Sequence, residues 1–428
     1  MSEGTAVDQA VVLCGGLGSR LGSLAAAVPK PLLPVAGRPF LERLLFEIKR
    51  HGLHRILLLA AHMSAVVAAF AREASQRLDI EIEVALEPGR AGTGGALWHA
   101  RDRLDPRFFL FNGDSWFDFN ILDLAAAEPR APSAIVAMAL RRISDPSRYG
   151  TVEMRDGRVT SFSAQGSRTG PAFVNGGVYV VDRRILALLT PDCSLEQNIL
   201  QPLAASGQVA GRVYDGYFID IGVPSDYERA QTEIPARQRR GAIFLDRDGV
   251  LNADHGYVGE IERFDWLPGA MAAIKSVNDS GMFVFVVTNQ AGVARGLYSE
   301  EDVRRVHEHM SRSLAGVGAH VDDFRYCPFH PQGSVPAYTR ASDRRKPAPG
   351  MLLELMACWP VDRTQSIVIG DQESDVEAGN AAGLPSYLIR KGEDLGALLA
   401  QCIASRRETT KTLLLSDPTS MRLDTTAK

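Results

Sequence analysis

The chain has 428 residues, enough for two or three domains of ordinary size. It is 45% hydrophobic and 23% charged with a net charge of −4, so it lacks the basic excess of a nucleic-acid-binding protein. No apolar run is long enough to span a membrane, and the start MSEGTAVDQAVVL lacks the pattern of a secretion signal. The five cysteines show no disulfide-like spacing, which predicts a reducing cytoplasm.

The first half alternates strand-like and helix-like runs, which favours an α/β fold with a mainly parallel sheet and helices on both faces. Strands are predicted at 10–14, 55–61, 80–87 and 108–112, and helices at 39–51, 64–78 and 95–104. From Ser133 the pattern becomes more β-like. Asp156-Gly157 predicts the turn of a hairpin over 149–162, an insert that could cover a substrate.

The composition changes at 230–241, where a polar, basic segment with a proline predicts a linker, placed at 233–240. A second α/β series follows, with strands predicted at 242–245, 282–288, 366–370 and 385–389 and helices at 268–280, 299–314 and 349–359. Ser299 with Asp302 three residues later is a helix-capping signature. The domains are therefore predicted at 9–232 and 241–403, with a mobile tail at 404–428.

A glycine-rich loop follows the first strand and contains Gly15, Gly16, Gly18, Ser19 and Arg20. In open α/β sheets ligands bind at the carboxyl ends of the strands, where this loop is expected. Glycines let the backbone approach a phosphate closely, and successive N–H groups can form an anion-binding nest. The loop therefore predicts binding of a nucleoside triphosphate.

The strings GGLGSRL and PKPLLPVAGRP give residues 9–232 a resemblance to the sugar-phosphate nucleotidyltransferases, which join a nucleoside triphosphate to a sugar 1-phosphate and release pyrophosphate. The strings FNGDS and FIDIG are similar to the branch that handles heptose or mannose 1-phosphates. The resemblance implies that Asp114 and Asp220 hold Mg²⁺ and that Arg20 and Lys30 stabilise the triphosphate and the transition state.

The same resemblance implies that Thr93 and Gly94 lie in the loop on the base and ribose side, and that Glu196 contacts the sugar. The chain departs from the family at one place. Many relatives carry a Glu-Lys pair after the hairpin strand, whose lysine meets the sugar phosphate, whereas this chain reads FSAQG at 162–166. The sugar-phosphate contact is then either absent or supplied elsewhere, with Arg168 as one candidate.

A second set of chemical motifs begins at Asp246 and Asp248, directly after a predicted strand. Asp246 is predicted to attack phosphorus and Asp248 to protonate the leaving oxygen and then activate water. Further groups follow in the order that this chemistry needs. They are Thr288 and Asn289 for phosphate binding, Lys346 for charge neutralisation, and Asp371 and Asp375, which with Asp246 and Asp248 are the predicted Mg²⁺ ligands.

These motifs give residues 241–390 a resemblance to the haloacid dehalogenase superfamily, and more closely to phosphatases of heptose 1,7-bisphosphate and histidinol phosphate. The resemblance implies that Arg345 meets the substrate. Relatives usually bind a structural zinc through Cys-x-His and Cys-x-Cys pairs, but here the two places read Cys327-Pro328-Phe329 and Ser342-Asp343-Arg344. A structural zinc site needs four ligands, so no zinc is expected and Cys327 is predicted to be a small buried residue.

The two motif sets together predict a bifunctional enzyme of GDP-heptose synthesis. The carboxyl half would hydrolyse the 7-phosphate of D-glycero-α-D-manno-heptose 1,7-bisphosphate, and the amino half would then transfer GMP from GTP to the 1-phosphate. Three alternatives stay open: mannose or CTP in place of heptose or GTP, a non-catalytic regulatory amino half, and a histidinol phosphatase. No nucleic-acid or membrane partner is expected, and the sequence leaves the oligomeric state and the anomer undetermined.

Overall fold

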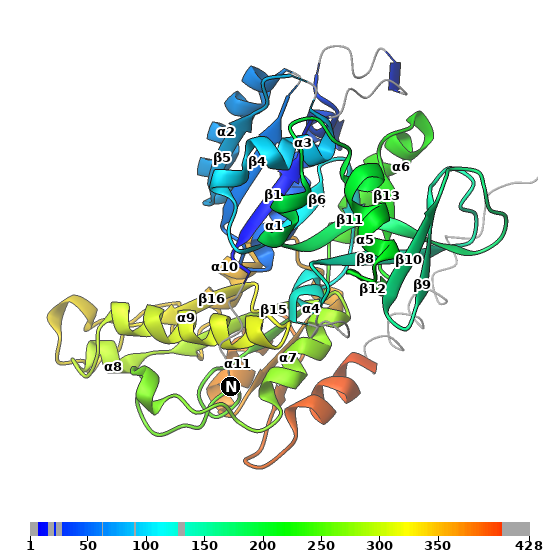
Figure 1. Cartoon of the computed structure of the whole chain (residues 1–428). Coiled ribbons are helices and arrows are strands. Elements are labelled where there is room, and N and C mark those ends of the chain that lie inside the picture. Colours follow the sequence, from blue (N-terminus) through cyan, green and yellow to red (C-terminus); the bar gives the residue numbers. More distant parts are fainter. Residues whose placement is uncertain are drawn as a thin grey trace, which may run out of the picture. The chain divides into compact units, whose positions relative to one another are not determined.

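The computed structural model describes residues 7–15, 21–22, 28–61, 63–89, 91–126 and 133–404. Contacts within the chain divide it into two units, Met1–Gln238 with Arg312–His320, and Arg239–Ser311 with Val321–Lys428 (Figure 1). The division after Gln238 falls inside the predicted linker. Residues 233–238 of that linker are not irregular, because they complete helix α6 (Pro224–Gln238). The predicted tail, apart from Ala404, lies outside the described residues.

The first unit is built on a nine-stranded sheet in the order β5-β4-β1-β6-β11-β8-β12-β10-β9. Its strands are β1 (Gln9–Leu13), β4 (Arg55–Ala60), β5 (Glu81–Leu86), β6 (Arg107–Asn112), β8 (Val136–Ile143), β9 (Thr151–Arg155), β10 (Arg158–Ser163), β11 (Ala172–Asp182) and β12 (Val209–Tyr214). The helices of this unit, besides α6, are α1 (Phe40–Arg50), α2 (Ser64–Leu78), α3 (Gly92–His99), α4 (Ile121–Ala126) and α5 (Gln201–Ala205). Two small antiparallel pairs complete it, β2 (Pro34–Val35) with β3 (Arg38–Pro39) and β7 (Ser115–Phe117) with β13 (Phe218–Asp220).

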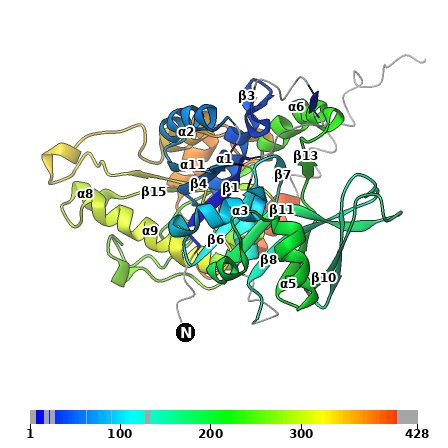
Figure 2. The same ribbon diagram turned by 45° about the horizontal axis from the view of Figure 1, so that its top comes forward.

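Strand β1 is buried on both faces, which explains its continuous apolar sequence. Ala10 and Val12 belong to a core cluster with side chains of α1 and α2, whereas Val11 belongs to a second cluster with side chains of α3. Because successive strand residues point to opposite faces, α1 and α2 cover one face and α3 the other, as the turned view shows (Figure 2).

The first four strands in this order, β5, β4, β1 and β6, run parallel to one another. From β11 onward the sheet is mixed, because β11 runs antiparallel to both β6 and β8. The predicted hairpin is present as β9 and β10, and its turn residues Asp156 and Gly157 both have positive φ, the conformation that a two-residue hairpin turn requires.

The second unit has a five-stranded, all-parallel sheet in the order β16-β15-β14-β17-β18. Its strands are β14 (Ala242–Leu245), β15 (Phe283–Asn289), β16 (Asp323–Cys327), β17 (Ile367–Gly370) and β18 (Ser386–Leu388). Its helices are α7 (Ala270–Asp279), α8 (Ala291–Ala294), α9 (Glu300–Gly316), α10 (Gly350–Cys358) and α11 (Glu373–Ala381), although residues 312–316 of α9 count with the first unit.

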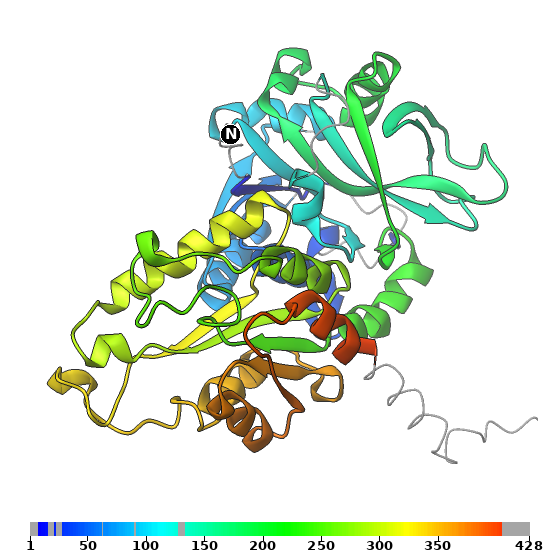
Figure 3. The same ribbon diagram turned by 90° about the horizontal axis from the view of Figure 1, so that it is seen from below.

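Both faces of this second sheet are covered. Phe283, Phe285 and Val287 of β15 pack with side chains of α10 and α11, which Figure 3 shows in orange. Val284 and Val286, which point to the opposite face, are also fully buried. The predicted cap at the start of α9 is confirmed: the Asp302 carboxylate accepts from the Ser299 amide, and the Ser299 hydroxyl accepts from the Asp302 amide.

Short 3₁₀ or π turns connect several of these elements. They are η2 (Lys30–Leu32), η3 (Arg101–Arg103), η4 (Arg183–Leu188), η5 (Leu195–Leu200), η6 (Ile261–Arg263), η7 (Pro336–Tyr338) and η8 (Arg363–Gln365). Among the described residues, no helix has the length and hydropathy needed to cross a bilayer.

Candidate active sites

A buried lysine joins two carboxylates in the first unit. The Lys30 ammonium lies 2.6 Å from Asp114 Oδ2 and 3.2 Å from Asp220 Oδ1. Burial lowers the pKa of Lys30, but the charges and hydrogen bonds of the two aspartates outweigh this effect and raise it above its ordinary value. Burial and the Asp114 charge raise the pKa of Asp220, and Lys30 opposes them.

Strand pairing brings these two aspartates together across 106 positions of sequence. Asp220 lies opposite Ser115 in the β13–β7 pair, and the Ile221 amide donates to the Asp114 carbonyl. Gly113 lets the backbone before Asp114 pass close to the end of β1, because a Cβ at this position would lie 2.5 Å from the carbonyl oxygen of Leu13. The local fold therefore places Asp114 and Asp220 at the end of the parallel strands, where the sequence predicted a metal site.

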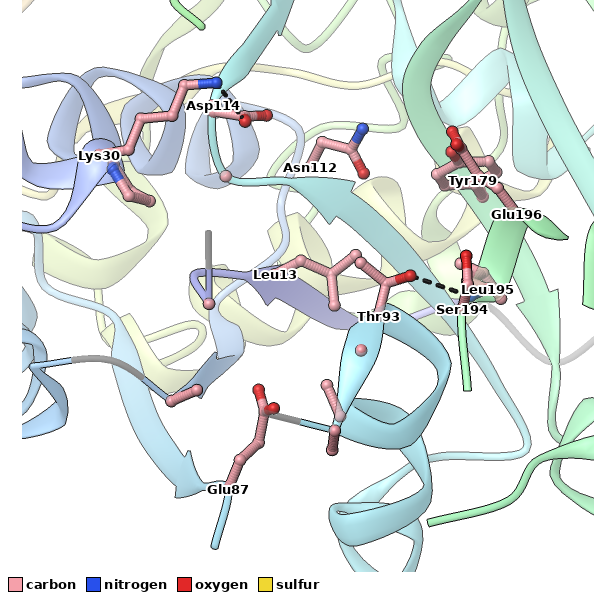
Figure 4. Close-up of a pocket in the computed structure, with 17 residues that line it drawn as sticks. Leu13, Lys30, Glu87, Thr93, Asn112, Asp114, Tyr179, Ser194, Leu195 and Glu196 are labelled. Carbon is pink, nitrogen blue, oxygen red and sulfur yellow. Dashed lines mark hydrogen bonds and ion pairs between the residues drawn. The ribbon is translucent and has the colours of Figure 1, made fainter. Parts of the chain in front are cut away.

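A pocket of about 460 Å³ opens beside Asp114, a volume suited to a small-molecule ligand. Figure 4 shows three regions of its wall: Lys30 with Asp114, Glu87, and Tyr179 with Glu196. The residues that line the pocket are Leu13, Gly15, Lys30, Pro31, Ala61, Glu87, Ala91, Gly92, Thr93, Ala96, Asn112, Gly113, Asp114, Tyr179, Ser194, Leu195 and Glu196.

Glu196 is part of a polar network at one end of the pocket. The Asn175 side-chain amide donates to Glu196 Oε1 at 3.1 Å and to the Tyr179 hydroxyl at 2.5 Å. The Gly177 amide donates to Asn175 Oδ1 at 3.0 Å, which fixes the orientation of the Asn175 side chain. Tyr179 and Glu196 line the pocket, so this arrangement offers a hydroxyl and a carboxylate to a polar ligand such as a sugar.

The predicted residues of the first site take different positions. Gly15, Lys30, Thr93, Asp114 and Glu196 line the pocket, whereas Gly16, Gly18, Ser19 and Arg20 lie outside the described residues. Gly94 is not among the lining residues; its amide donates to the Cys193 carbonyl, and a Cβ there would lie 2.6 Å from Cys193 Sγ. Its place is therefore one of close packing.

The structure also locates Arg168, whose role the sequence left open, and Glu87, which the sequence analysis did not identify. Arg168, the candidate for the missing cation, pairs at 3.4 Å with Glu153 of β9 and does not line the pocket. Glu87 was missed, although it directly follows strand β5, and that position at a strand end could have identified it. Burial raises the pKa of Glu87, and a hydrogen bond with the Ala91 backbone opposes the shift.

The second unit has its own centre of one lysine and several carboxylates. The Lys346 ammonium lies 2.8 Å from Asp246 Oδ1 and 2.6 Å from Asp375 Oδ1, and it donates to the Val287 carbonyl. Burial raises the pKa of Asp246 to about 7; the Lys346 charge opposes this rise and the Asp375 charge adds to it. Asp246, Asp371 and Asp375 each offer an oxygen within 4.8 Å of the others.

The parallel sheet explains why these groups meet. Asp246 follows β14, Thr288 lies near the end of β15, and Asp371 follows β17, so all three lie at the same edge of the sheet. Gly249 closes this edge with a φ of +83°, and a Cβ there would lie 2.3 Å from Asp371 Oδ2. A side chain at position 249 would therefore be strained and would displace a predicted metal ligand.

The Asp248 carboxylate is not in the three-carboxylate group and instead lies in a separate hydrogen-bond network. Arg247 Nη2 donates to both of its oxygens at 3.0 Å, Asn252 Nδ2 to Oδ1 at 2.9 Å and Gln290 Nε2 to Oδ2 at 3.0 Å. These donors fix the direction of the Asp248 carboxylate, whereas the structure places only Asp246, Asp371 and Asp375, among the described residues, where their carboxylates could share one ion.

The remaining predicted residues divide between phosphate binding and support. Thr288 is buried, and its hydroxyl oxygen accepts from Gln290 at 2.8 Å. Asn289 pairs with Lys346 in both directions, since its Nδ2 donates to the Lys346 carbonyl and its Oδ1 accepts from the Lys346 amide. The structure thus gives Asn289 the task of holding Lys346 in place. Arg345 is half-buried, and its guanidinium donates to the Phe329 carbonyl at 3.5 Å.

The loop after Cys327, where relatives were expected to bind zinc, is held by other contacts. The Arg340 guanidinium lies 3.9 Å from the centre of the Phe329 ring, a cation–π contact. The hydroxyls of Tyr326 and Tyr338 donate to the two oxygens of Glu300 at 2.6 and 2.9 Å. Cys327 itself is fully buried in the core of the second sheet, as its sequence context predicted.

The two units therefore have the architecture and the groups of phosphate-handling α/β enzymes, each with a buried lysine beside several aspartates. Comparison with known proteins agrees. Residues 9–237 match the nucleotidyl transferase family, and residues 343–413 match the HAD-hydrolase-like family. Because the first match covers more than half of the chain, the protein belongs to the nucleotidyl transferase family.

The second half belongs to a phosphatase family. A D-glycero-beta-D-manno-heptose-1,7-bisphosphate 7-phosphatase of Rhodopseudomonas palustris is 52% identical over 165 residues, which are 39% of this chain and 91% of the relative. The enzyme of the same name from Escherichia coli K12 is 42% identical over 155 residues, or 36% of this chain and 81% of the relative. The crystal structure of HddC from Yersinia pseudotuberculosis complexed with GMP-PN is 27% identical and covers 53% of this chain and 98% of HddC, with a TM-score of 0.47.

Proposed function

We propose that the protein carries out two consecutive steps of nucleotide-activated heptose synthesis. The second unit hydrolyses the 7-phosphate of D-glycero-D-manno-heptose 1,7-bisphosphate. The first unit then transfers GMP from GTP to the remaining heptose 1-phosphate, which gives GDP-heptose and pyrophosphate. One observation carries the proposal: a nucleotidyl transferase is joined in one chain to a unit 52% identical to a heptose bisphosphate phosphatase. The five cysteines are free, which supports our proposal that the protein acts in the cytoplasm.

In the phosphatase step, an Asp246 oxygen attacks phosphorus, and the bond between phosphorus and the 7-oxygen of the sugar breaks. The Asp248 proton passes to that oxygen, and Asp248 then takes a proton from the water that hydrolyses the aspartyl phosphate. Lys346, 2.8 Å from Asp246 Oδ1, offsets the charge that gathers on the phosphoryl oxygens. The Thr288 hydroxyl accepts from Gln290, so its own proton is available for a phosphate oxygen.

A cluster of basic side chains supports a substrate with two phosphates. Arg345 and Arg295 are close enough that each guanidinium charge lowers the pKa of His330, after the larger effect of burial. Burial likewise lowers the pKa of Arg345, and the Arg295 charge adds to that shift. Because Arg345 directly precedes Lys346, we propose that these two arginines bind the second phosphate of the substrate.

Glu87 supports guanine as the base. In the pocket it lies away from Lys30 and Asp114, the groups expected at the phosphates (Figure 4). Guanine presents two adjacent N–H donors, N1–H and the 2-amino group, to which a carboxylate can accept a pair of hydrogen bonds. The cytosine edge lacks this donor pair, so the same carboxylate would discriminate between GTP and CTP.

Replacing Glu87 by Gln should lower kcat/KM for GTP by about 10-fold to 100-fold, because a hydrogen bond to a charged group is worth roughly 1.5–3 kcal/mol. The value for CTP should change little. Glu83→Gln is the matched control, since Glu83 lies on β5, the strand that Glu87 follows, but is exposed and pairs with Arg103. Equal losses for both nucleotides would contradict the assignment of Glu87 to the base.

We propose that both units use Mg²⁺. Asp246, Asp371 and Asp375 fit this ion, because hard divalent cations prefer carboxylate oxygens together with substrate phosphate. Asp114 and Asp220 offer a similar pair in the first unit. When bound, the ion would neutralise phosphate charge. Treatment with a chelator should abolish both reactions, and added Mg²⁺ should restore them; phosphate release that survives chelation would contradict the proposal for the second unit.

The sugar and its anomer are tested by a panel of nucleotides and sugar phosphates. The names of the phosphatase relatives specify the beta anomer, whereas our hypothesis from the sequence was written with the alpha anomer, a choice that the sequence itself leaves undetermined. Both anomers of the bisphosphate, and mannose 1-phosphate, should be offered with GTP, CTP and ATP. Product formation is expected with a heptose 1-phosphate and GTP. Turnover of no heptose 1-phosphate with any nucleotide would overturn the transferase assignment.

A further inference from the structure

Tyr298 is held in one position beside the phosphatase centre. Its ring packs between two glycines, since a Cβ at Gly259 or at Gly292 would lie 2.2 Å from a ring carbon. Its hydroxyl donates to Gln290 Oε1 at 2.7 Å. The backbone of Gly292 also hydrogen-bonds the hydroxyl. Because the Gly292 amide donates to the phenol oxygen, the phenol proton points to Gln290.

Gln290 connects this tyrosine to two reacting groups. Its side chain is almost completely buried, and its Nε2 donates to Asp248 Oδ2 at 3.0 Å and to Thr288 Oγ1 at 2.8 Å. An amide has two N–H bonds, so both are used. If the amide were rotated by 180°, its oxygen would face the Asp248 carboxylate, and two acceptors would be opposed. The Tyr298 hydroxyl therefore selects the orientation in which Gln290 donates.

We propose that Tyr298 and Gln290 are positioning residues for proton transfer by Asp248. The pair holds the Asp248 carboxyl group at the angle from which its proton reaches the leaving oxygen. Neither side chain is required to touch the substrate. The inference rests on the phosphatase reaction of this unit and not on the identity of the sugar.

The test compares leaving groups that differ in their need for a proton. A sugar alkoxide is a poor leaving group and needs general-acid assistance, whereas p-nitrophenolate leaves without it. The measured quantity is kcat/KM, which covers the steps up to formation of the aspartyl phosphate and not its hydrolysis. In the whole protein, Tyr298→Phe should lower kcat/KM for heptose 1,7-bisphosphate, and for β-glycerophosphate as a second alkyl ester, by about tenfold, a fraction of what general acid catalysis typically supplies. The kcat/KM for p-nitrophenyl phosphate should change less than about twofold.

Gln290→Glu should show the same split more strongly, because the glutamate side chain has no N–H to donate to Asp248 Oδ2. Tyr326→Phe is the control: it also removes a phenol hydrogen bond in this unit, to Glu300, and should leave kcat/KM unchanged for alkyl and aryl esters. Since the phenylalanine ring still fills the space between the two glycines, Tyr298→Phe is expected to fold. Parallel losses with alkyl and aryl esters, or no loss with either, would overturn the positioning role. Failure of the unaltered protein to hydrolyse any of the three esters would instead overturn the proposed phosphatase.

Discussion

Replacement of Asp246 by Asn is expected to reduce phosphate release by on the order of 10⁴-fold, the scale seen when a covalent nucleophile is removed. The amide cannot form the phosphoryl-enzyme bond. It can still accept from Lys346, which lies 2.8 Å from Asp246 Oδ1. Because Asp246 and Asp375 share that one ammonium, removal of one buried charge should not lower the melting temperature. Phosphate release from the bisphosphate measures the effect.

The same variant should keep its nucleotidyl transfer when it is given heptose 1-phosphate directly. Asp279→Asn is the matched control: it removes an exposed carboxylate that pairs with Lys275 at the end of α7 and should leave both reactions intact. Phosphate release by Asp246→Asn at more than a tenth of the normal rate would show that another group is the nucleophile.

Replacement of Asp114 by Asn is expected to impair nucleotidyl transfer and to leave phosphate release intact. Product formation from heptose 1-phosphate and GTP should fall by on the order of 10³-fold, because the variant loses a charge that the proposed metal and the transition state both require. The lost carboxylate oxygen is also the nearer partner of Lys30, at 2.6 Å. Phosphate release by the second unit should be unchanged.

This second variant also discriminates between a catalytic and a regulatory first unit. A non-catalytic first unit that only binds nucleotide sugar would form no product before or after the substitution. Asp114→Asn would then change only the regulation of the phosphatase. Asp215→Asn is the control, since Asp215 is a largely exposed carboxylate of the same unit, paired with Arg141. Undiminished product formation by Asp114→Asn would contradict the assignment of this carboxylate.

The sequence predicted the catalytic groups best where each follows a buried strand. Asp246 and Asp371 stand directly after apolar strands, and Asp114 follows one at the second position. Because parallel strands end at one edge of a sheet, the strand pattern alone brings Asp246 and Asp371 together. Lys30 and Lys346 were identified from their motifs, and the structure brings each within 3.2 Å of two carboxylates.

Sequence patterns could not assign the parts of the site that depend on side-chain direction. Asn289 resembled a phosphate ligand, but its amide holds the Lys346 backbone. The Asp248 carboxylate was expected at the metal, yet donors from three other residues hold it elsewhere. The Asn175 network was missed for a similar reason. Its members come from two elements and are joined by side-chain hydrogen bonds, which the spacing of residues in the sequence does not reveal.

The central claim is that one chain performs both steps, and a single reaction tests it. The whole protein, supplied with Mg²⁺, GTP and D-glycero-D-manno-heptose 1,7-bisphosphate, should release phosphate and pyrophosphate in equal amounts and accumulate GDP-heptose in the same amount. The Asp246→Asn variant in the same mixture should release neither phosphate nor pyrophosphate from the bisphosphate. Phosphate release without any nucleotide sugar, under conditions in which heptose 1-phosphate accumulates, would contradict the account.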